Sequence, residues 1–138
     1  MSVRHELEIT FGDADPAGIA YYPRILDFCH RAFETFMRAT TGTDYAATYL
    51  REDLGFPTVS LHADFKAPMR FGDRIAVDVA VAELSARSVT FEYRFTRAGD
   101  GTLCAVVRNV AVAVGRQSFK PVAIPERYAA AFRAHRMP

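Results

Sequence analysis

The chain has 138 residues, of which 50% are hydrophobic and 24% charged. A chain of this length suits one domain, residues 1–138, that buries about 65–70% of the surface its unfolded form exposes. The formal net charge of +1 is far below that of a basic nucleic-acid-binding domain, and no tract of about 18 apolar residues indicates a membrane span. The first residues contain no hydrophobic signal-peptide core, so we expect a cytoplasmic protein that binds neither nucleic acid nor membrane.

The first predicted elements are a strand and a long helix. Residues 3–11 alternate apolar and polar side chains, the period of a half-buried strand. From about Pro23 to Thr41, apolar side chains recur every three or four residues, which predicts an amphipathic helix. Pro23 suits the first turn, where its missing N–H is not needed, and Gly42 suits the position after the end. The apolar stripe comprises Ile25, Leu26, Cys29, Ala32, Phe33, Phe36 and Met37.

The rest of the chain predicts mainly strands. A short helix is expected from Asp44 to about Asp53, capped by Thr43 and ended by Gly55. Four strands follow at residues 58–66, 74–83, 87–97 and 102–114, and the sequence AGDG between the last two is typical of a hairpin. A final helix is predicted to begin after Pro125.

These elements indicate an α+β fold. We expect the last four strands to form an antiparallel meander, with the N-terminal strand as a fifth. The helix at 23–41 is the only element apolar enough to fill the buried face of the sheet. Its length of about 28 Å is close to the roughly 33 Å of a ten-residue strand, so we expect the sheet to curl around it.

Two compositional features bear on ligands. Cys29 and Cys104 occur without a CxxC pair or zinc-ligand spacing, so we expect buried free thiols and no metal site. Residues 1–66 contain ten acidic and six basic residues, whereas residues 103–138 contain one acid, Glu126, and six basic residues. This asymmetry favours a small polyanionic ligand over DNA, although a solvated basic face on the last helix explains it equally well.

The segment FGDADPAGIAYYPR, residues 11–24, places two aspartates directly before the long helix. One interpretation is structural, because Asp, Pro and Gly are turn residues and the carboxylates could cap the helix. The other is a reaction centre. The helix start offers free N–H groups and a positive dipole to a developing oxyanion, and a nearby carboxylate supplies a base or nucleophile. Acyl transfer uses both parts, and no Ser-His-Asp or Cys-His set competes for the role.

Two motifs resemble the hotdog-fold acyl-CoA thioesterases of the 4-hydroxybenzoyl-CoA thioesterase type. The first is FGDADPAGIAYYPR, with the pattern Asp-x-Asp-Pro-x-Gly-(x)3-Tyr-Pro, and the second is ADFKAPMRFGD. The resemblance covers nearly the whole chain in element order. It implies a curved five-stranded antiparallel sheet wrapped around a long central helix, and hydrolysis of acyl-CoA to the acid and coenzyme A. Coenzyme A is part of the substrate, and no separate cofactor is implied. The family's sites lie between the subunits of a homodimer, and two dimers commonly pair as a homotetramer.

The resemblance assigns roles to residues of the first motif. Asp15 becomes the catalytic carboxylate, acting as nucleophile on the thioester or as base for water, and Asp13 shapes the loop. The backbone N–H of Tyr22 would polarise the thioester oxygen, and Gly18 would let the substrate approach closely. An aromatic acyl group is expected, although Tyr21 replaces a tryptophan of several relatives and short aliphatic groups stay possible. The candidate acyl contacts are Tyr21, Ser60 and His62, with a surface or interface histidine at position 62 and simple packing of the Tyr21 ring as the alternatives.

Coenzyme A carries phosphates that would bind basic side chains near the predicted hairpin LSARSVTF and in the C-terminal third. The candidates are Arg87, Ser88, Arg116 and Lys120, and each could equally be a plain surface residue. Two other functions remain open. An acyl-CoA dehydratase or hydratase on the same fold would need a histidine paired with an acid, for which His30 is the candidate. A non-catalytic acyl-CoA-binding module should lack the acid at position 15.

Overall fold

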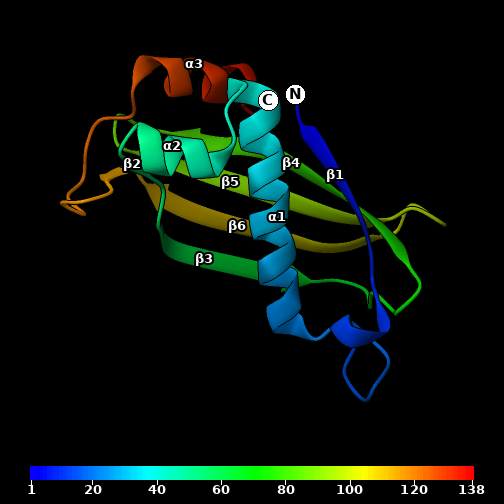
Figure 1. The fold of residues 1–138 in the computed structure, drawn as a ribbon. Coiled ribbons are helices and arrows are strands. Elements are labelled where there is room, and N and C mark those ends of the chain that lie inside the picture. The colour runs from blue at the N-terminus through cyan, green and yellow to red at the C-terminus, as the bar shows by residue number, and fades with distance from the viewer.

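The computed structural model describes all of residues 1–138, and one long helix lies across a face of an antiparallel sheet that curves around it (Figure 1). The helix is α1 (Tyr22–Thr41). The sheet has the strand order β1-β4-β5-β6-β3. Its strands are β1 (Val3–Glu8), β3 (Thr58–Phe65), β4 (Arg74–Leu84), β5 (Ser88–Arg97) and β6 (Leu103–Val112). The expected α+β architecture, with five antiparallel strands and a central helix, is confirmed.

The predicted four-strand meander is wrong at β3. Strands β4, β5 and β6 do follow one another as a meander, but β3 pairs with β6 rather than with β4. Strand β1 pairs with β4, with Leu7 opposite Ile75. Because β1 and β5 occupy both edges of β4, β3 can pair only with the free edge of β6. The outer edge of β3 therefore has no partner strand in the chain.

The smaller elements differ from the expected boundaries. Strand β1 ends at Glu8 rather than Phe11, because residues 11–13 turn as a short 3₁₀ helix. Helix α2 (Tyr45–Arg51) is capped by the Asp44 carboxylate, which accepts a hydrogen bond from the Ala47 N–H, so the expected Thr43 cap is wrong. The helix ends at Arg51, before Gly55. Short strands β2 (Leu54–Gly55) and β7 (Val114–Gly115) form a separate ribbon, and α3 (Glu126–Ala134) begins after Pro125 as predicted.

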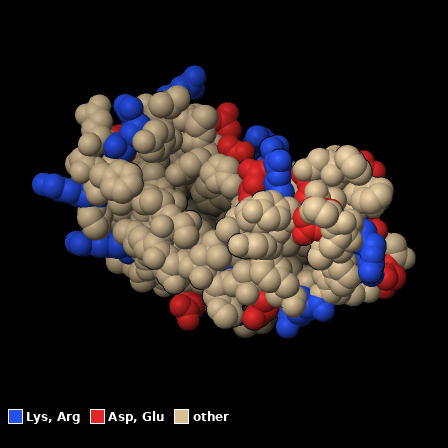
Figure 2. Space-filling view, turned by 90° about the horizontal axis from the view of Figure 1, so that it is seen from below, with Lys and Arg blue, Asp and Glu red and all other residues tan.

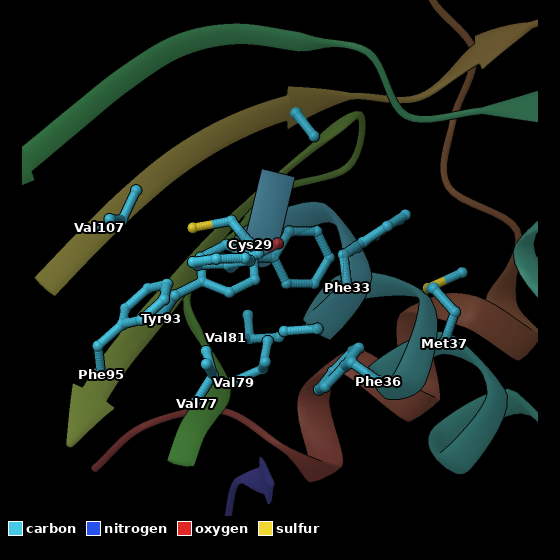
Figure 3. Packing of buried hydrophobic residues seen from close by; sticks show 14 of the residues in the cluster. Cys29, Phe33, Phe36, Met37, Val77, Val79, Val81, Tyr93, Phe95 and Val107 are labelled. Atoms are coloured by element: carbon cyan, nitrogen blue, oxygen red, sulfur yellow. The ribbon is translucent and has the colours of Figure 1, made fainter. Parts of the chain in front are cut away.

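The core lies between α1 and the concave face of the sheet. Phe36 of α1 is fully buried, and its ring lies edge-on to Phe91 at 5.5 Å. In Figure 3, Phe36 extends from the helix on the side where the valines of β4 lie. The predicted apolar stripe is buried apart from Leu26, whose side chain is 39% exposed. Leu26 thus marks a part of the helix that the sheet of this chain does not cover.

The end of α1 and the two cysteines are also as the sequence predicts. Gly42 adopts φ 73° just after α1, the left-handed conformation that glycine accepts at helix ends. Cys29 and Cys104 are buried and unpaired, and burial raises the pKa of Cys29 to about 12. No helix in the chain combines the length and the apolar character that crossing a membrane requires.

The Tyr128 hydroxyl connects α3 to α2. It donates to Glu52 Oε2 at 2.6 Å and lies 2.8 Å from the hydroxyl of Thr48, which is fully buried. Arg127 donates to both oxygens of the same carboxylate. The hydrogen bonds from Tyr128 and then Arg127 lower the pKa of Glu52 below its usual range. The link should therefore add stability while Glu52 is ionised, and lose it as pH falls through the lowered pKa.

Tyr128→Phe is expected to reduce the free energy of unfolding by about 1–3 kcal/mol, because the buried Thr48 hydroxyl loses its partner. Urea unfolding followed by circular dichroism at pH 7 measures the loss, and the difference from the wild type should narrow in acid. Tyr49→Phe is the matched control, since that tyrosine is 37% exposed. Equal stability of wild type and Tyr128→Phe at pH 7 would contradict the expected role of the hydroxyl.

Candidate active site

The loop before α1 is shaped by Asp13. Its Oδ2 accepts hydrogen bonds from the Thr10 backbone N–H at 3.0 Å and from Thr10 Oγ1 at 2.9 Å. Its backbone carbonyl accepts from the Tyr21 N–H at 2.8 Å. Asp13 thus ties the first turn of the loop to the residue that precedes the helix, which is the loop-shaping role expected from the sequence.

Asp15 lies in a tight turn within the same loop. Its backbone N–H donates to the Ile19 carbonyl and its carbonyl accepts from the Gly18 N–H, both at 2.9 Å. The side chain is half-buried, and Oδ1 accepts from the Ala17 N–H at 2.9 Å. Oδ2 makes no hydrogen bond, so one carboxylate oxygen is free to react. Gly18 has φ 79°, a conformation that other residues rarely adopt, and the space where a Cβ would stand is open.

The start of α1 provides a free hydrogen-bond donor. Tyr21 is the N-cap residue, Tyr22 is the first helical residue, and Pro23 has no N–H. The Arg24 N–H is used by the Tyr21 carbonyl at 2.8 Å, whereas the Tyr22 N–H has no partner. The helix of 20 residues directs the positive end of its dipole to this point. Both tyrosine rings are exposed and contact each other, with their centroids 5.6 Å apart.

A cavity of about 420 Å³ adjoins the helix start. It is lined by Tyr22 and Ile25 of α1, by residues 19–20 of the loop, and by residues 65–69, which begin with the last residue of β3. Lys66 is its only charged side chain. The Ala20 N–H donates to the Met69 carbonyl at 2.6 Å, which joins the two segments. Figure 2, which looks onto this end of the molecule, shows a central hollow among largely uncharged side chains, with acidic side chains on one side of it. The two sequence motifs therefore meet at one apolar cavity.

The candidate contacts on β3 face away from this cavity. His62 pairs with Arg108 and Ser60 with Val110, on the face of the sheet opposite α1. The His62 side chain is 76% exposed and its Nε2 lies 3.3 Å from Asp64 Oδ2. Within one chain, these two side chains are not brought to the Asp15 loop, whereas Tyr21 is.

The candidate phosphate contacts lie at the opposite end of the sheet. Strand β4 starts beside the loop, where the Ile9 N–H donates to the Asp73 carbonyl, and it ends about 33 Å away near Arg87. Ser88 Oγ is engaged by Ser85 Oγ at 2.6 Å, in the turn between β4 and β5. The guanidinium of Arg116 lies over the Tyr49 ring, 5.8 Å from its centroid, and Lys120 follows in the same loop after β7. One chain therefore does not unite these residues with Asp15.

Lys66, which was not expected at the site from the sequence, lies on the wall of the cavity. Its position was the available signal, because Lys66 is the last residue of the alternating segment and belongs to the second motif. No group of three or more His, Cys, Asp or Glu side chains is arranged to hold a metal ion.

Comparison with known proteins shows a consistent pattern. The family model of the thioesterase-like superfamily matches residues 9–132. A 1,4-dihydroxy-2-naphthoyl-CoA hydrolase of Synechocystis sp. is 25% identical over 122 residues, 88% of each chain. The acyl-CoA thioesterase YbgC of Haemophilus influenzae is 30% identical over 127 residues, 91% of this chain and 90% of that protein. The structure of the gentisyl-coenzyme A thioesterase BH1999 is similar with a TM-score of 0.83 at 26% identity, covering 94% of this chain and 99% of that one.

Proposed function

Since the chain belongs to the thioesterase-like superfamily, we propose that it is an acyl-CoA thioesterase that hydrolyses its substrate to a free acid and coenzyme A. The observation that carries the proposal is the free oxygen of Asp15 in the loop that leads to the unpartnered N–H of Tyr22. An aromatic acyl group is supported by the apolar cavity and by the names of two relatives, which specify naphthoyl and gentisyl thioesters. The name of the YbgC relative specifies only an acyl-CoA, so short aliphatic acyl groups are the alternative.

The chemistry follows from the two free groups. The Tyr22 N–H donates to the thioester carbonyl oxygen and, with the helix dipole, stabilises the negative charge that develops there. Asp15 Oδ2 then attacks the carbonyl carbon, the carbon–sulfur bond breaks, and the thiolate of coenzyme A leaves, after which water hydrolyses the mixed anhydride. Alternatively, Asp15 takes a proton from water as the water attacks. Both routes need an ionised Asp15.

The dehydratase alternative has less support. His30 is 58% exposed, and its nearest acid is Glu34, 3.9 Å away on the same exposed face of α1. Eight residues separate His30 from Tyr22, about 12 Å along the helix. Nothing brings this pair to the free N–H at the helix start. A purely binding role does not explain why an acid with a free oxygen occupies position 15.

We further propose that the enzyme works as a homodimer joined through β3. The outer edge of β3 has no partner strand, and three of its large apolar side chains are exposed: Val59 by 61%, Leu61 by 45% and Phe65 by 53%. An exposed apolar edge strand invites pairing with another chain. Two such dimers could assemble as a tetramer, which sedimentation analysis distinguishes from a dimer.

Antiparallel pairing of two β3 strands would also complete the site. It would bring the Thr58 end of the partner's β3 beside the Phe65 end of this chain. The Thr58 end lies near the turn between β4 and β5. Thr58 pairs with Ala111 of β6, and the backbone N–H of Ala113, the first residue after β6, donates to the Arg87 carbonyl in that turn. Arg87 of the partner subunit would thereby approach the Asp15 loop. We propose that the coenzyme A phosphates bind there, on the other subunit from Asp15.

A hydrolysis screen tests the proposed function. Benzoyl-, hydroxybenzoyl-, phenylacetyl- and short aliphatic CoA thioesters are compared by kcat/KM, with release of the coenzyme A thiol as the readout. We expect hydrolysis of several of them and the highest kcat/KM for an aromatic one. Best activity on a short aliphatic thioester would replace the aromatic assignment, and a lack of hydrolysis throughout the series would overturn the function.

A further inference from the structure

A second, smaller cavity of about 100 Å³ lies between α1 and the concave face of the sheet. Its walls include the aromatic side chains of Phe33 and Phe91, which suits a planar ring. Leu26 and Cys29 contribute from α1, and Leu61 closes it on the side of β3. Half-exposed Leu26 and Leu61 stand at its mouth, so the cavity opens towards the seam between α1 and β3.

Two polar groups in this apolar cavity lack partners. Asn109 Nδ2 donates to Thr58 Oγ1 at 2.9 Å, and this bond orients the amide so that Oδ1 is buried without a hydrogen bond. Tyr93 is 2% exposed, and its hydroxyl makes no hydrogen bond. Figure 3 shows Tyr93 near Cys29, another residue that lines the cavity. Asn109 and Tyr93 lie two register positions apart on neighbouring strands, because Asn109 pairs with Phe91 and Tyr93 with Val107. Buried polar atoms are nearly always paired, so an unpaired buried acceptor and an unpaired hydroxyl on residues of one cavity wall indicate a ligand or water.

Tyr93 remains a neutral donor under ordinary conditions. Burial, with a smaller effect of Cys29, raises the pKa of Tyr93 well above that of a free tyrosine. Its O–H can therefore donate to a bound hydroxyl while Asn109 Oδ1 accepts from that same hydroxyl. An unsubstituted acyl group would leave both polar atoms unpaired.

The two cavities follow one another along the same seam. Tyr22 and Ile25 line the first cavity and Leu26 and Cys29 the second, while Phe65 and Leu61 take the corresponding places on β3. Seven residues separate Tyr22 from Cys29, about 10 Å of helix. An acyl group whose carbonyl binds the Tyr22 N–H can therefore reach the second cavity only if its far end lies about that distance away.

We propose that Tyr93 and Asn109 determine specificity by binding a hydroxyl group at the far end of an elongated aromatic acyl group. The inference rests on the proposed thioesterase function, because the Tyr22 N–H fixes the other end of that group. Neither residue touches the reacting atoms, so they select the substrate and take no part in the chemical step. A 4-hydroxycinnamoyl group, longer than 4-hydroxybenzoyl by a vinylene unit, has the required shape.

The first test compares 4-hydroxycinnamoyl-CoA with cinnamoyl-CoA as substrates. We expect the wild type to prefer the hydroxylated thioester by about 10- to 100-fold in kcat/KM, because a site built to bind a hydroxyl rejects the analogue that lacks it. Tyr93→Phe and Asn109→Leu should reduce the preference to below about threefold, because the removed polar atoms no longer favour the hydroxylated thioester or disfavour the unsubstituted one. Tyr49→Phe, whose ring lies outside the cavity, should keep the preference. A preference retained in both cavity variants would overturn the inference.

The second test needs neither catalysis nor a substitution. Calorimetric titration of the wild-type protein with 4-hydroxycinnamate and with cinnamate should show tighter binding of the hydroxylated acid. Equal affinities would mean that the cavity holds only water, and would overturn the inference even if thioesters are hydrolysed. Tighter binding of 4-hydroxycinnamate without hydrolysis of any thioester would instead overturn the proposed function and leave the recognition site in place.

Discussion

Asp15→Asn is expected to lower kcat by about 100- to 10,000-fold on the best thioester, the usual loss when an acid–base or nucleophilic group is removed. Asparagine keeps a side-chain oxygen for the hydrogen bond from the Ala17 N–H, so the turn should persist. What disappears is the negative charge of the free Oδ2. KM and thermal stability should therefore change little, and steady-state kinetics with a thermal unfolding curve measure all three quantities.

Asp13→Asn is the matched control, because it removes a carboxylate two residues away in the same loop. Asp13 Oδ2 accepts both bonds from Thr10, and asparagine can accept them only as weaker neutral hydrogen bonds. The free energy of unfolding should therefore fall by about 0.5–2 kcal/mol, the range for a weakened or lost cap. Its kcat should stay within a few-fold of the wild type. If Asp15→Asn retains most of its kcat, the loop is only a turn, and the catalytic carboxylate lies elsewhere.

The sequence predicts α1 to within a residue because its signals are local. The apolar stripe sets its buried face, Pro23 fixes the backbone at its start, and Gly42 supplies the left-handed residue at its end. The cap of α2 shows the limit of such signals, since Thr43 and Asp44 are both good caps and adjacent in sequence. Asp44 is the cap because its side chain reaches the Ala47 N–H, and the residue types alone do not predict which of the two side chains does so.

The position of β3 could not be predicted from its own residues. Its strict alternation predicts a strand, but the choice between β4 and β6 as partner depends on where β1 pairs, more than fifty residues earlier in the chain. Long-range pairing of this kind is not encoded in a short window. The error matters for function, because a strand at the sheet edge can join a second subunit, whereas a strand between two others cannot.

The candidate catalytic loop was recognisable because Asp15, Gly18 and Tyr22 are close in sequence. The proposed specificity residues were not, since Tyr93 and Asn109 come from different strands and meet Cys29 only after the sheet packs on α1. The sequence does contain one signal for Asn109, because it is a polar residue within an otherwise largely apolar strand. Which face it occupies depends on its pairing with Phe91 and Leu61, so its direction towards α1 appears only in the structure.

The distance between Asp15 and Arg87 within one chain leads to a further expected result. If each site combines Asp15 of one subunit with Arg87 of the other, two impaired subunits should restore one intact site. Arg87→Ala alone should raise KM about tenfold or more with kcat little changed, since a charge-assisted contact to phosphate is lost. An unchanged KM at low salt would remove Arg87 from the phosphate site before any mixing experiment.

Heterodimers of an Asp15→Asn subunit and an Arg87→Ala subunit, co-expressed with different tags and purified through both, provide the decisive measurement. The intact Asp15 then faces the intact Arg87 of the partner subunit, so we expect about half the wild-type kcat with the wild-type KM. Heterodimers of Asp15→Asn with wild type set the reference, because they too contain one working site in either arrangement. If both residues instead act within one chain, the only subunit with an intact Asp15 is the one that carries Arg87→Ala. The heterodimer would then show the raised KM of Arg87→Ala, and the proposed shared site would be wrong.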